Sequence, residues 1–139
     1  MTTSARVLYT AKAHTSGGRE GVSRTDDNRL NVELSNPGAK ATGTNPEQLF
    51  AVGWSACFLS ALQLIAAKKK LVFSAPPTDD VEVDLLLSNQ DGFSLRVRHN
   101  VTLPGIDSAT ARALVEEGHL TCPYSKATHG NIDVETHIL

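Results

Sequence analysis

The residues of this sequence best suited to chemistry are its two cysteines, Cys57 and Cys122. A cysteine thiolate is a nucleophile and a metal ligand, and two neighbouring thiols can exchange electrons by forming a disulfide. Two cysteines are too few for a disulfide-framework protein. They lie far apart in the chain and form no C-x-x-C motif, so their spacing leaves open whether the two sulfurs meet.

Each cysteine has a local setting that predicts a different reactivity. Cys57 lies between Ala56 and Phe58 in an apolar stretch, where a free cysteine often serves as a small core residue. Burial raises the pKa of a thiol, so a reactive Cys57 requires a nearby cation. Cys122 directly precedes Pro123, and a helical turn beyond it would give this thiol thiolate character through the helix dipole. The apolar setting of Cys57 and the helix dipole at Cys122 thus predict that Cys122 is the more acidic thiol. The alternative is that Cys122 is an incidental loop cysteine.

The remaining motifs give weaker signals. The histidines are scattered, and none belongs to a C-x-x-C or H-E-x-x-H pair of the kind that anchors zinc. His119 lies three residues before Cys122, but two ligands do not make a metal site, so we expect none. The segment Gly53–Cys57 is similar to a G-x-S-x-G nucleophile elbow, but it lacks the final glycine and lies within an expected helix.

The elements that must position these residues follow from the hydrophobic pattern. Alternation over residues 30–34 predicts a half-buried strand, and Asn45 followed by Pro46 predicts the start of a long helix. In chain order, the expected elements are an antiparallel meander of strands at 7–13, 22–24 and 30–34 with a turn at Gly17 and Gly18, a helix from 46 to about 68, a hairpin of strands at 81–88 and 93–103, a helix from 107 or 108 to about 118, and a last strand at 132–138. This order predicts an α+β fold with antiparallel sheets around the long helix.

The long helix is the most unusual of these elements. No charged residue occurs between Leu49 and Ala67, and apolar side chains occur on every face. Such a length would also suit a membrane span, but Ser55, Ser60 and Gln63 interrupt it and the sequence offers no second span. A helix that is apolar all round also belongs in a protein core. We therefore expect a long buried central helix and no contact with a membrane.

Length and composition bound the class of protein. The chain has 139 residues, which predicts a single domain over residues 1–139. Its 40% hydrophobic and 20% charged residues are typical of a globular protein, and a net charge of −2 gives no footprint for nucleic acid. The first residues lack the apolar core of a secretory signal. We therefore expect a cytoplasmic protein, in which paired cysteines are more often redox-active or metal-binding than structural.

Several spaced segments carry a family resemblance over nearly the whole chain. They are Gly17–Gly21 (GGREG), Thr44–Ala51 (TNPEQLFA), Gly53–Phe58 (GWSACF), Leu103–Gly105 (LPG), Cys122–Ser125 (CPYS) and Gly130–Val134 (GNIDV). Together they resemble the organic hydroperoxide resistance proteins of the osmotically inducible protein C superfamily, and imply the fold of that superfamily. Trp54 stands where this family usually has tyrosine, and the loop before Thr44 is short.

The resemblance implies a thiol peroxidase that reduces organic hydroperoxides to alcohols without a metal, haem or other cofactor. Cys57 matches the peroxidatic cysteine of the family and Cys122 its resolving cysteine, while Arg19 and Glu47 match the charged pair that activates Cys57. This assignment replaces the local preference for Cys122 as the more acidic thiol. Arginine can stabilise a buried thiolate, and a carboxylate can hold its guanidinium through a bidentate pair.

The resemblance also implies the substrate and the partners. Cys57 would become a sulfenic acid, Cys122 would condense with it to a disulfide, and a lipoylated protein or another dithiol would reduce that disulfide. An apolar setting of Phe50, Trp54 and Phe58 would favour alkyl or fatty-acid hydroperoxides, although core packing also explains these residues. Two alternative hypotheses stay open: the osmotically inducible subgroup, and a redox-sensing or hydrophobic-ligand-binding dimer without turnover.

The spacing of Glu47 and Cys57 carries a geometric consequence. Ten residues separate them on the expected helix, which corresponds to a rise of about 15 Å. The side chain of Arg19 spans only about half of that rise, so one straight helix cannot present both residues to it. Either the helix bends near Gly53 or the two residues come from different subunits. Because the family forms an intertwined homodimer, we expect the site to be built across the dimer interface.

Overall fold

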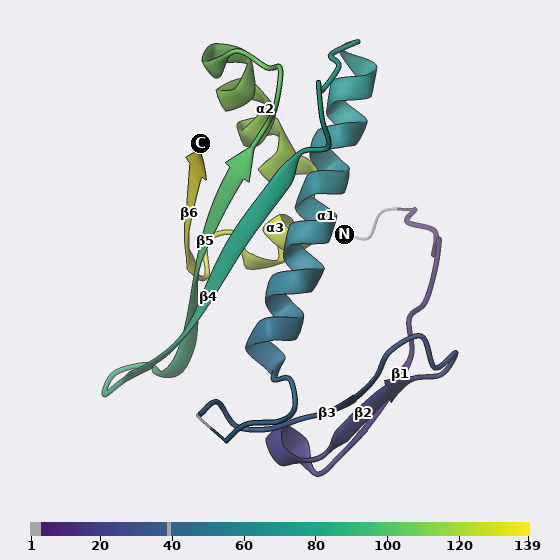
Figure 1. Ribbon diagram of the computed structural model, residues 1–139, viewed down its shortest axis with the longest axis vertical. Coiled ribbons are helices and arrows are strands. Elements are labelled where there is room, and N and C mark those ends of the chain that lie inside the picture. The colour runs from purple at the N-terminus through teal and green to yellow at the C-terminus, as the bar shows by residue number, and fades with distance from the viewer. Residues whose placement is uncertain (1–3, 39) are drawn as a thin grey trace. The chain divides into compact units, whose positions relative to one another are not determined.

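The chain divides into two compact units, Met1–Pro46 and Glu47–Leu139, and each unit is described separately. The computed structural model describes residues 4–38 and 40–139. Residues 1–3, which belong to the N-terminal segment expected to lack a secretory signal, lie outside the described residues. Figure 1 shows a strand-rich first unit and a second unit of helices and a sheet. The expectation of a single domain over residues 1–139 stays a prediction, because contacts alone do not show whether either unit folds without the other.

The first unit is a small antiparallel meander. Strand β1 (Ala13–Ser16) pairs with β2 (Val22–Thr25), and β2 pairs with β3 (Asn31–Glu33). A single 3-10 turn, η1 (Gly18–Glu20), connects β1 to β2. The predicted N-terminal antiparallel meander is therefore confirmed, with its turn at the expected glycine pair.

The segment before β1 departs from the prediction of a strand over residues 7–13. Strand structure begins only at Ala13, and Val7, Leu8 and Tyr9 are 82%, 82% and 79% exposed. Their alternation is typical of a strand, but a strand also needs a hydrogen-bonded neighbour. Among the residues that the structure describes, no strand pairs with residues 7–11.

The second unit packs three helices on one side of a three-stranded sheet (Figure 1). Its elements, in chain order, are α1 (Pro46–Lys68), β4 (Thr78–Ser88), β5 (Gly92–Thr102), α2 (Ser108–Thr121), α3 (Pro123–Thr128) and β6 (Asp133–Ile138). The predicted long helix, hairpin, second helix and last strand are all confirmed. Asp107 caps α2, since its carboxylate accepts a hydrogen bond from the backbone N–H of Thr110 at 3.2 Å.

The sheet of the second unit is mixed, which corrects the prediction of antiparallel sheets. Strands β4 and β5 form the expected antiparallel hairpin, but β6 runs parallel to β5, with Val97 opposite Val134. The reason is the connection: α2 and α3 lie between β5 and β6, and a helical crossover returns the chain in its original direction. A period-2 pattern gives the face of each residue but not the direction of its strand.

The core of the second unit lies between α1, α2 and β5. Trp54, Phe58, Leu62 and Ile65 recur every three or four residues along α1 and form its buried face. The side chains that β5 and α2 contribute to the same cluster are Val97, Val101, Ala111, Leu114 and Val115. This packing fixes α1 against the two elements that lead to Cys122.

The long helix α1 is apolar enough to cross a membrane by length and composition alone, with a mean hydropathy of 1.8 over a window that is 33% buried. Its buried face packs on the sheet and α2, as does the core helix of a soluble protein. The opposite face leaves Val52 and Leu64 68% and 52% exposed. One face of α1 is thus buried within its unit, and the expected long buried central helix stays a prediction.

Candidate active site

The two cysteines, far apart in the sequence, lie side by side in the structure. Cys57 is on α1, and Cys122 lies at the junction of α2 and α3. Both are free thiols, and Cys122 Sγ donates a hydrogen bond to Cys57 Sγ at 3.3 Å. Cys122 is fully buried and Cys57 is partly exposed. This arrangement holds two reduced thiols within a small shift of disulfide-forming distance, which is about 2.05 Å.

The position of Cys122 is fixed from both sides of a break between helices. Pro123 lacks a backbone N–H, so α2 cannot continue through it and α3 begins there instead. The N–H of Cys122 donates to the carbonyl of Gly118 at 2.8 Å, and its own carbonyl accepts from the N–H of Lys126 at 3.0 Å. Cys122 therefore ends α2 and caps α3, which is the helix N-terminus expected beyond this residue.

Burial raises the pKa of the Cys57 thiol, because removing the sulfur from water disfavours the thiolate. The backbone N–H of Tyr124 hydrogen-bonds this sulfur and lowers the pKa, whereas Cys122 raises it. The net direction is upward, so this environment keeps Cys57 protonated at neutral pH. A nucleophilic Cys57 consequently needs a further stabilising positive charge.

Arg19 lies in η1 of the first unit, in a turn that only glycines allow. Gly17 has a φ of 81°, and a Cβ at Gly21 would collide with the carbonyl oxygen of Ser16. The glycine-rich segment thus gives the Arg19 side chain a defined place in a tight turn. Because the first unit is described by itself, the pairing of Arg19 with Cys57 stays a prediction.

Glu47 lies in the first turn of α1, ten residues before Cys57. The helix stays α-helical through Gly53, which keeps the two residues about 15 Å apart along its axis. The helix therefore has no break at Gly53, the residue where a bend was expected if one chain brings Glu47 to Cys57. The alternative, in which the two residues of one site come from different subunits, stays a prediction.

The three aromatic residues expected to bind substrate lie in or beside the core. Trp54 and Phe58 are fully buried, and Phe50 is partly exposed. Phe50 and Trp54 pack edge to face with ring centroids 5.5 Å apart, and Phe58 stacks on His119 at 4.3 Å. Their substrate role stays a prediction, and of the three only Phe50 has surface open to solvent.

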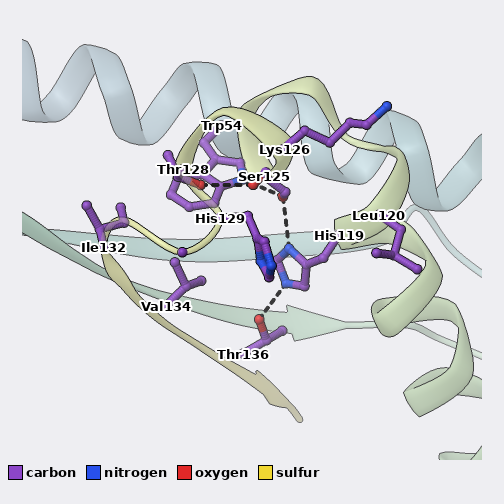
Figure 2. A pocket seen from close by; sticks show the side chains of 11 residues that line it. Trp54, His119, Leu120, Ser125, Lys126, Thr128, His129, Ile132, Val134 and Thr136 are labelled. Atoms are coloured by element: carbon purple, nitrogen blue, oxygen red, sulfur yellow. Dashed lines mark hydrogen bonds between the residues drawn. The ribbon is translucent and has the colours of Figure 1, made fainter.

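A buried polar network, which the sequence did not predict, lies close to the two thiols. The indole N–H of Trp54 donates to Ser125 Oγ at 3.0 Å. Ser125 Oγ is 2.8 Å from His119 Nδ1, and His119 Nε2 is 2.8 Å from Thr136 Oγ1 (Figure 2). Scattered polar residues in a sequence do not reveal which of their atoms meet. The one signal was the position of His119, three residues before Cys122.

A second buried polar pair was also missed. His99 Nδ1 and Asp79 Oδ2 are 2.6 Å apart, and both side chains are fully buried. Asp79 Oδ1 and His99 Nε2 have no hydrogen-bond partner among the described residues. The ring of His99 packs edge to face on Trp54 at 4.7 Å. The inward orientation of His99 could have been predicted from the sequence, because His99 lies two residues from each of the inward-facing residues Val97 and Val101 on one strand.

A cavity of about 440 Å³ lies beside the His119 network (Figure 2). Its lining residues are Trp54, His119, Leu120, Ser125, Lys126, Thr128, His129, Gly130, Ile132, Val134 and Thr136. Burial, and then the charge of nearby His99, lowers the pKa of His119 to about 4, so this ring is neutral at neutral pH. In the described part of the chain, no group of three or more His, Cys, Asp or Glu side chains is placed to hold a metal ion.

Several known proteins are similar to this chain over nearly its whole length. A family model described as OsmC-like protein matches residues 37–137. An organic hydroperoxide resistance protein from Xanthomonas axonopodis pv. citri is 44% identical over 138 residues, which cover 96% of this chain and 96% of that protein. The crystal structure of the organic hydroperoxide resistance protein OhrB of Bacillus subtilis is similar with a TM-score of 0.89 and 39% identity, covering 96% of this chain and 100% of that one. A Legionella pneumophila organic hydroperoxide resistance protein has a TM-score of 0.90 and 38% identity, covering 96% and 98%.

Proposed function

Because this chain belongs to the OsmC-like family, and within it to the organic hydroperoxide resistance proteins, we propose that it is a thiol peroxidase that reduces organic hydroperoxides to alcohols. The observation that carries this proposal is the 3.3 Å contact between the thiols of Cys57 and Cys122. A cysteine that reduces peroxides through a disulfide needs a second thiol within reach of its sulfenic acid. This pair meets that requirement within one chain.

The cycle has two steps on the protein and one with a reductant. The Cys57 thiolate attacks the terminal peroxide oxygen, the O–O bond breaks, and the leaving alkoxide takes a proton to become the alcohol. Cys122 then attacks the Cys57 sulfenic acid, water leaves, and a Cys57–Cys122 disulfide forms. A dithiol such as the lipoyl group of a lipoylated protein restores both thiols by exchange and is itself oxidised to a disulfide. The thiols carry the whole electron balance, so the cycle requires no metal or haem.

Arg19 and Glu47 are assigned to the activation of Cys57. Burial raises the pKa of this thiol, and a guanidinium beside the sulfur would lower it by stabilising the thiolate. Glu47 would orient that guanidinium through a bidentate ion pair. Because Glu47 and Cys57 of one helix are about 15 Å apart along its axis, a site that contains both is shared between two chains of an intertwined homodimer.

Exposed apolar side chains support such a homodimer. Val52 and Leu64 project from the open face of α1, and Val7, Leu8 and Tyr9 precede the first strand. These side chains offer apolar surface that an interface with a second copy would remove from water. In this proposal a second copy of the chain covers them.

The substrate is proposed to be an apolar hydroperoxide of the alkyl or fatty-acid type. The side chains of Phe50 and Leu59, on the same helix as Cys57, are apolar and partly exposed. A net charge of −2 gives no strong field to steer a charged substrate. We place this activity in the cytoplasm, where the reducing environment keeps paired thiols available.

Turnover with defined variants tests the proposal. The purified protein should consume tert-butyl or cumene hydroperoxide continuously when dihydrolipoamide is supplied. Cys57→Ser should abolish this activity, whereas Cys122→Ser should react with hydroperoxide once and lose the efficient cycle. Unchanged consumption by Cys57→Ser would reject Cys57 as the nucleophile. A redox sensor without turnover would form the disulfide once and would not be recycled by dihydrolipoamide.

A further inference from the structure

A buried hydrogen bond joins α1 to α3 beside the two thiols. Trp54 lies three residues before Cys57 on α1, and Ser125 lies three residues after Cys122 at the start of α3. The indole N–H of Trp54 donates to Ser125 Oγ at 3.0 Å, in a fully buried setting. Residues three apart in a helix share a face, so the same face of α1 that presents Cys57 also holds α3.

The directions of the remaining hydrogen bonds depend on which ring nitrogen of His119 carries the proton. Burial lowers the pKa of His119 to about 4, so the ring is neutral and one nitrogen is an acceptor. Ser125 Oγ accepts from Trp54, and in the tautomer with the proton on Nε2 the Ser125 hydroxyl donates to His119 Nδ1 at 2.8 Å. In the same tautomer His119 Nε2 donates to Thr136 Oγ1 at 2.8 Å. Figure 2 shows this chain of bonds running from α3 to β6.

The helix that receives these bonds has little stability of its own. α3 spans only Pro123–Thr128, and isolated helices of that length do not hold together in water. Its position therefore depends on contacts with the elements around it. Those contacts also place the backbone N–H of Tyr124 on the Cys57 sulfur.

We propose that Ser125, held by Trp54 and His119, is a positioning residue that fixes α3 so that Cys122 faces Cys57 and resolves its sulfenic acid. This role rests on the proposed peroxidase function but concerns only the step from sulfenic acid to disulfide. Neither Ser125 nor Trp54 touches the reacting sulfur atoms in this role. Removal of the Ser125 hydroxyl leaves the buried indole N–H and His119 Nδ1 without their shared partner, and α3 loses one of its hydrogen bonds to α1.

The Cys57 sulfenic acid either reacts with an added trap or is resolved by Cys122. The ratio of these two products would not change if Ser125 had only a structural role. Reduced protein is mixed with one equivalent of hydroperoxide in the presence of dimedone, which competes with Cys122 for the Cys57 sulfenic acid. We expect the trapped fraction to rise about tenfold in Ser125→Ala, since precise placement of reacting groups changes rates by such factors. Ser125→Thr, which keeps the hydroxyl, should restore the parent's partition. Val115→Ala removes core volume from α2 and serves as the control for general destabilisation; it should keep the parent's partition.

A second measurement does not depend on peroxide chemistry. In glutathione redox buffers, the equilibrium between dithiol and disulfide gives the effective concentration of Cys57 and Cys122 toward each other. Ser125→Ala should lower this value about tenfold, as should Trp54→Phe, which keeps a ring but removes the indole N–H. Unchanged effective concentration in the folded variants would overturn the positioning role. If the parent forms this disulfide in glutathione buffers but never reacts with hydroperoxide, the proposed function fails, whereas a lowered effective concentration in Ser125→Ala would still show that Ser125 positions the two thiols.

Discussion

Gly118 of α2 lies directly against Leu62 of α1, so close that a Cβ at position 118 would be 2.6 Å from Leu62 Cδ2. Leu62 is fully buried, and a close-packed interior gives it little room to move aside. The carbonyl of Gly118 also accepts the N–H of Cys122 at 2.8 Å. This single crossing therefore sets both the packing of two helices and the position of the proposed resolving thiol.

Gly118→Ala should destabilise the chain even though alanine is the better helix former. Overpacking a closed core costs about 1–3 kcal/mol, whereas replacing glycine within a helix gains about 1 kcal/mol or less. Urea unfolding should therefore give a lower free energy of unfolding for Gly118→Ala than for the parent. Glu116→Ala, on the exposed face of the same helix, is the control and should stay within about 0.5 kcal/mol of the parent. Equal stability of Gly118→Ala and the parent would contradict the close crossing.

Mixed dimers test whether two chains share each active site. Arg19→Ala and Cys57→Ser should each be inactive as pure proteins. Co-expressed, they form dimers in which the Cys57 of one chain meets the Arg19 of the other. Half of the dimers are then mixed and each has one intact site, so we expect about a quarter of the parent's peroxidase activity. A co-expressed sample as inactive as either pure variant would show that each site lies within one chain.

The sequence predicted most of the helices and strands and singled out the two cysteines, but it did not predict how the two thiols lie relative to each other. The Asn45–Pro46 start and the uncharged run after it predicted α1, because local capping and hydropathy decide where a helix forms. The contact of Cys57 with Cys122 depends on how α1, α2 and α3 pack, which no local pattern encodes. The parallel pairing of β5 with β6 was missed for the same reason.

The buried polar network shows a different limit. Trp54 and Ser125 are far apart in the sequence, and each alone fits an ordinary core or helix position. Only three-dimensional packing reveals that one side chain donates to the other. The prediction of a strand over residues 7–13 was wrong for a different reason. These residues have a strand-like pattern, but no strand within the described chain pairs with residues 7–11.

Acid should destabilise the second unit through His119. Its pKa is lowered to about 4 from the ordinary 6.5, so between these pH values the unfolded chain binds a proton that the folded chain does not. Stability therefore falls as the pH falls through this window, by at most about 1.4 kcal/mol per pH unit for one proton. Urea unfolding across the window should show a smaller dependence in His119→Gln. The exposed His137→Gln is the control and should keep the slope of the parent; an unchanged slope in His119→Gln would contradict the lowered pKa.

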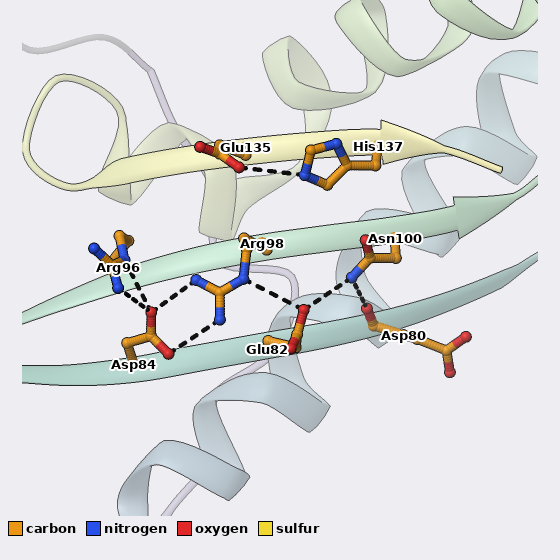
Figure 3. Close-up of polar contacts among 8 residues, drawn as sticks. All are labelled: Asp80, Glu82, Asp84, Arg96, Arg98, Asn100, Glu135 and His137. Carbon is orange, nitrogen blue, oxygen red and sulfur yellow. Dashed lines mark hydrogen bonds and ion pairs between the residues drawn. The ribbon is translucent and has the colours of Figure 1, made fainter.

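The outer face of the β4–β5 pair carries a charge network with its own pH signature (Figure 3). Arg98 donates to both carboxylate oxygens of Asp84, at 2.7 and 3.1 Å, and Arg96 donates to Asp84 Oδ2 at 2.9 Å. These hydrogen bonds, those of Arg98 first, lower the pKa of Asp84 to about 2 from 3.8. The stabilisation is present above pH 3.8 and is lost as the pH falls toward about 2.

Asp84→Asn should therefore lower the melting temperature at neutral pH and flatten its decline in this acid range. Thermal unfolding monitored by circular dichroism at neutral and acid pH measures both effects. The matched control is Asp80→Asn on the same strand, since Asp80 accepts from Asn100 through its backbone carbonyl rather than its carboxylate. A melting temperature that falls equally in Asp80→Asn and Asp84→Asn would contradict a specific role for the Asp84 pair.

In the proposed function, Cys57 and Cys122 act as one redox pair on an organic hydroperoxide. The most direct measurement counts free thiols after one equivalent of cumene hydroperoxide, followed by intact-mass analysis. We expect the parent to lose both thiols and to gain an intramolecular disulfide, Cys122→Ser to lose its single thiol, and Cys57→Ser to keep Cys122 free. Loss of the Cys122 thiol in Cys57→Ser at the parent's rate, or retention of both thiols in the parent, would contradict it.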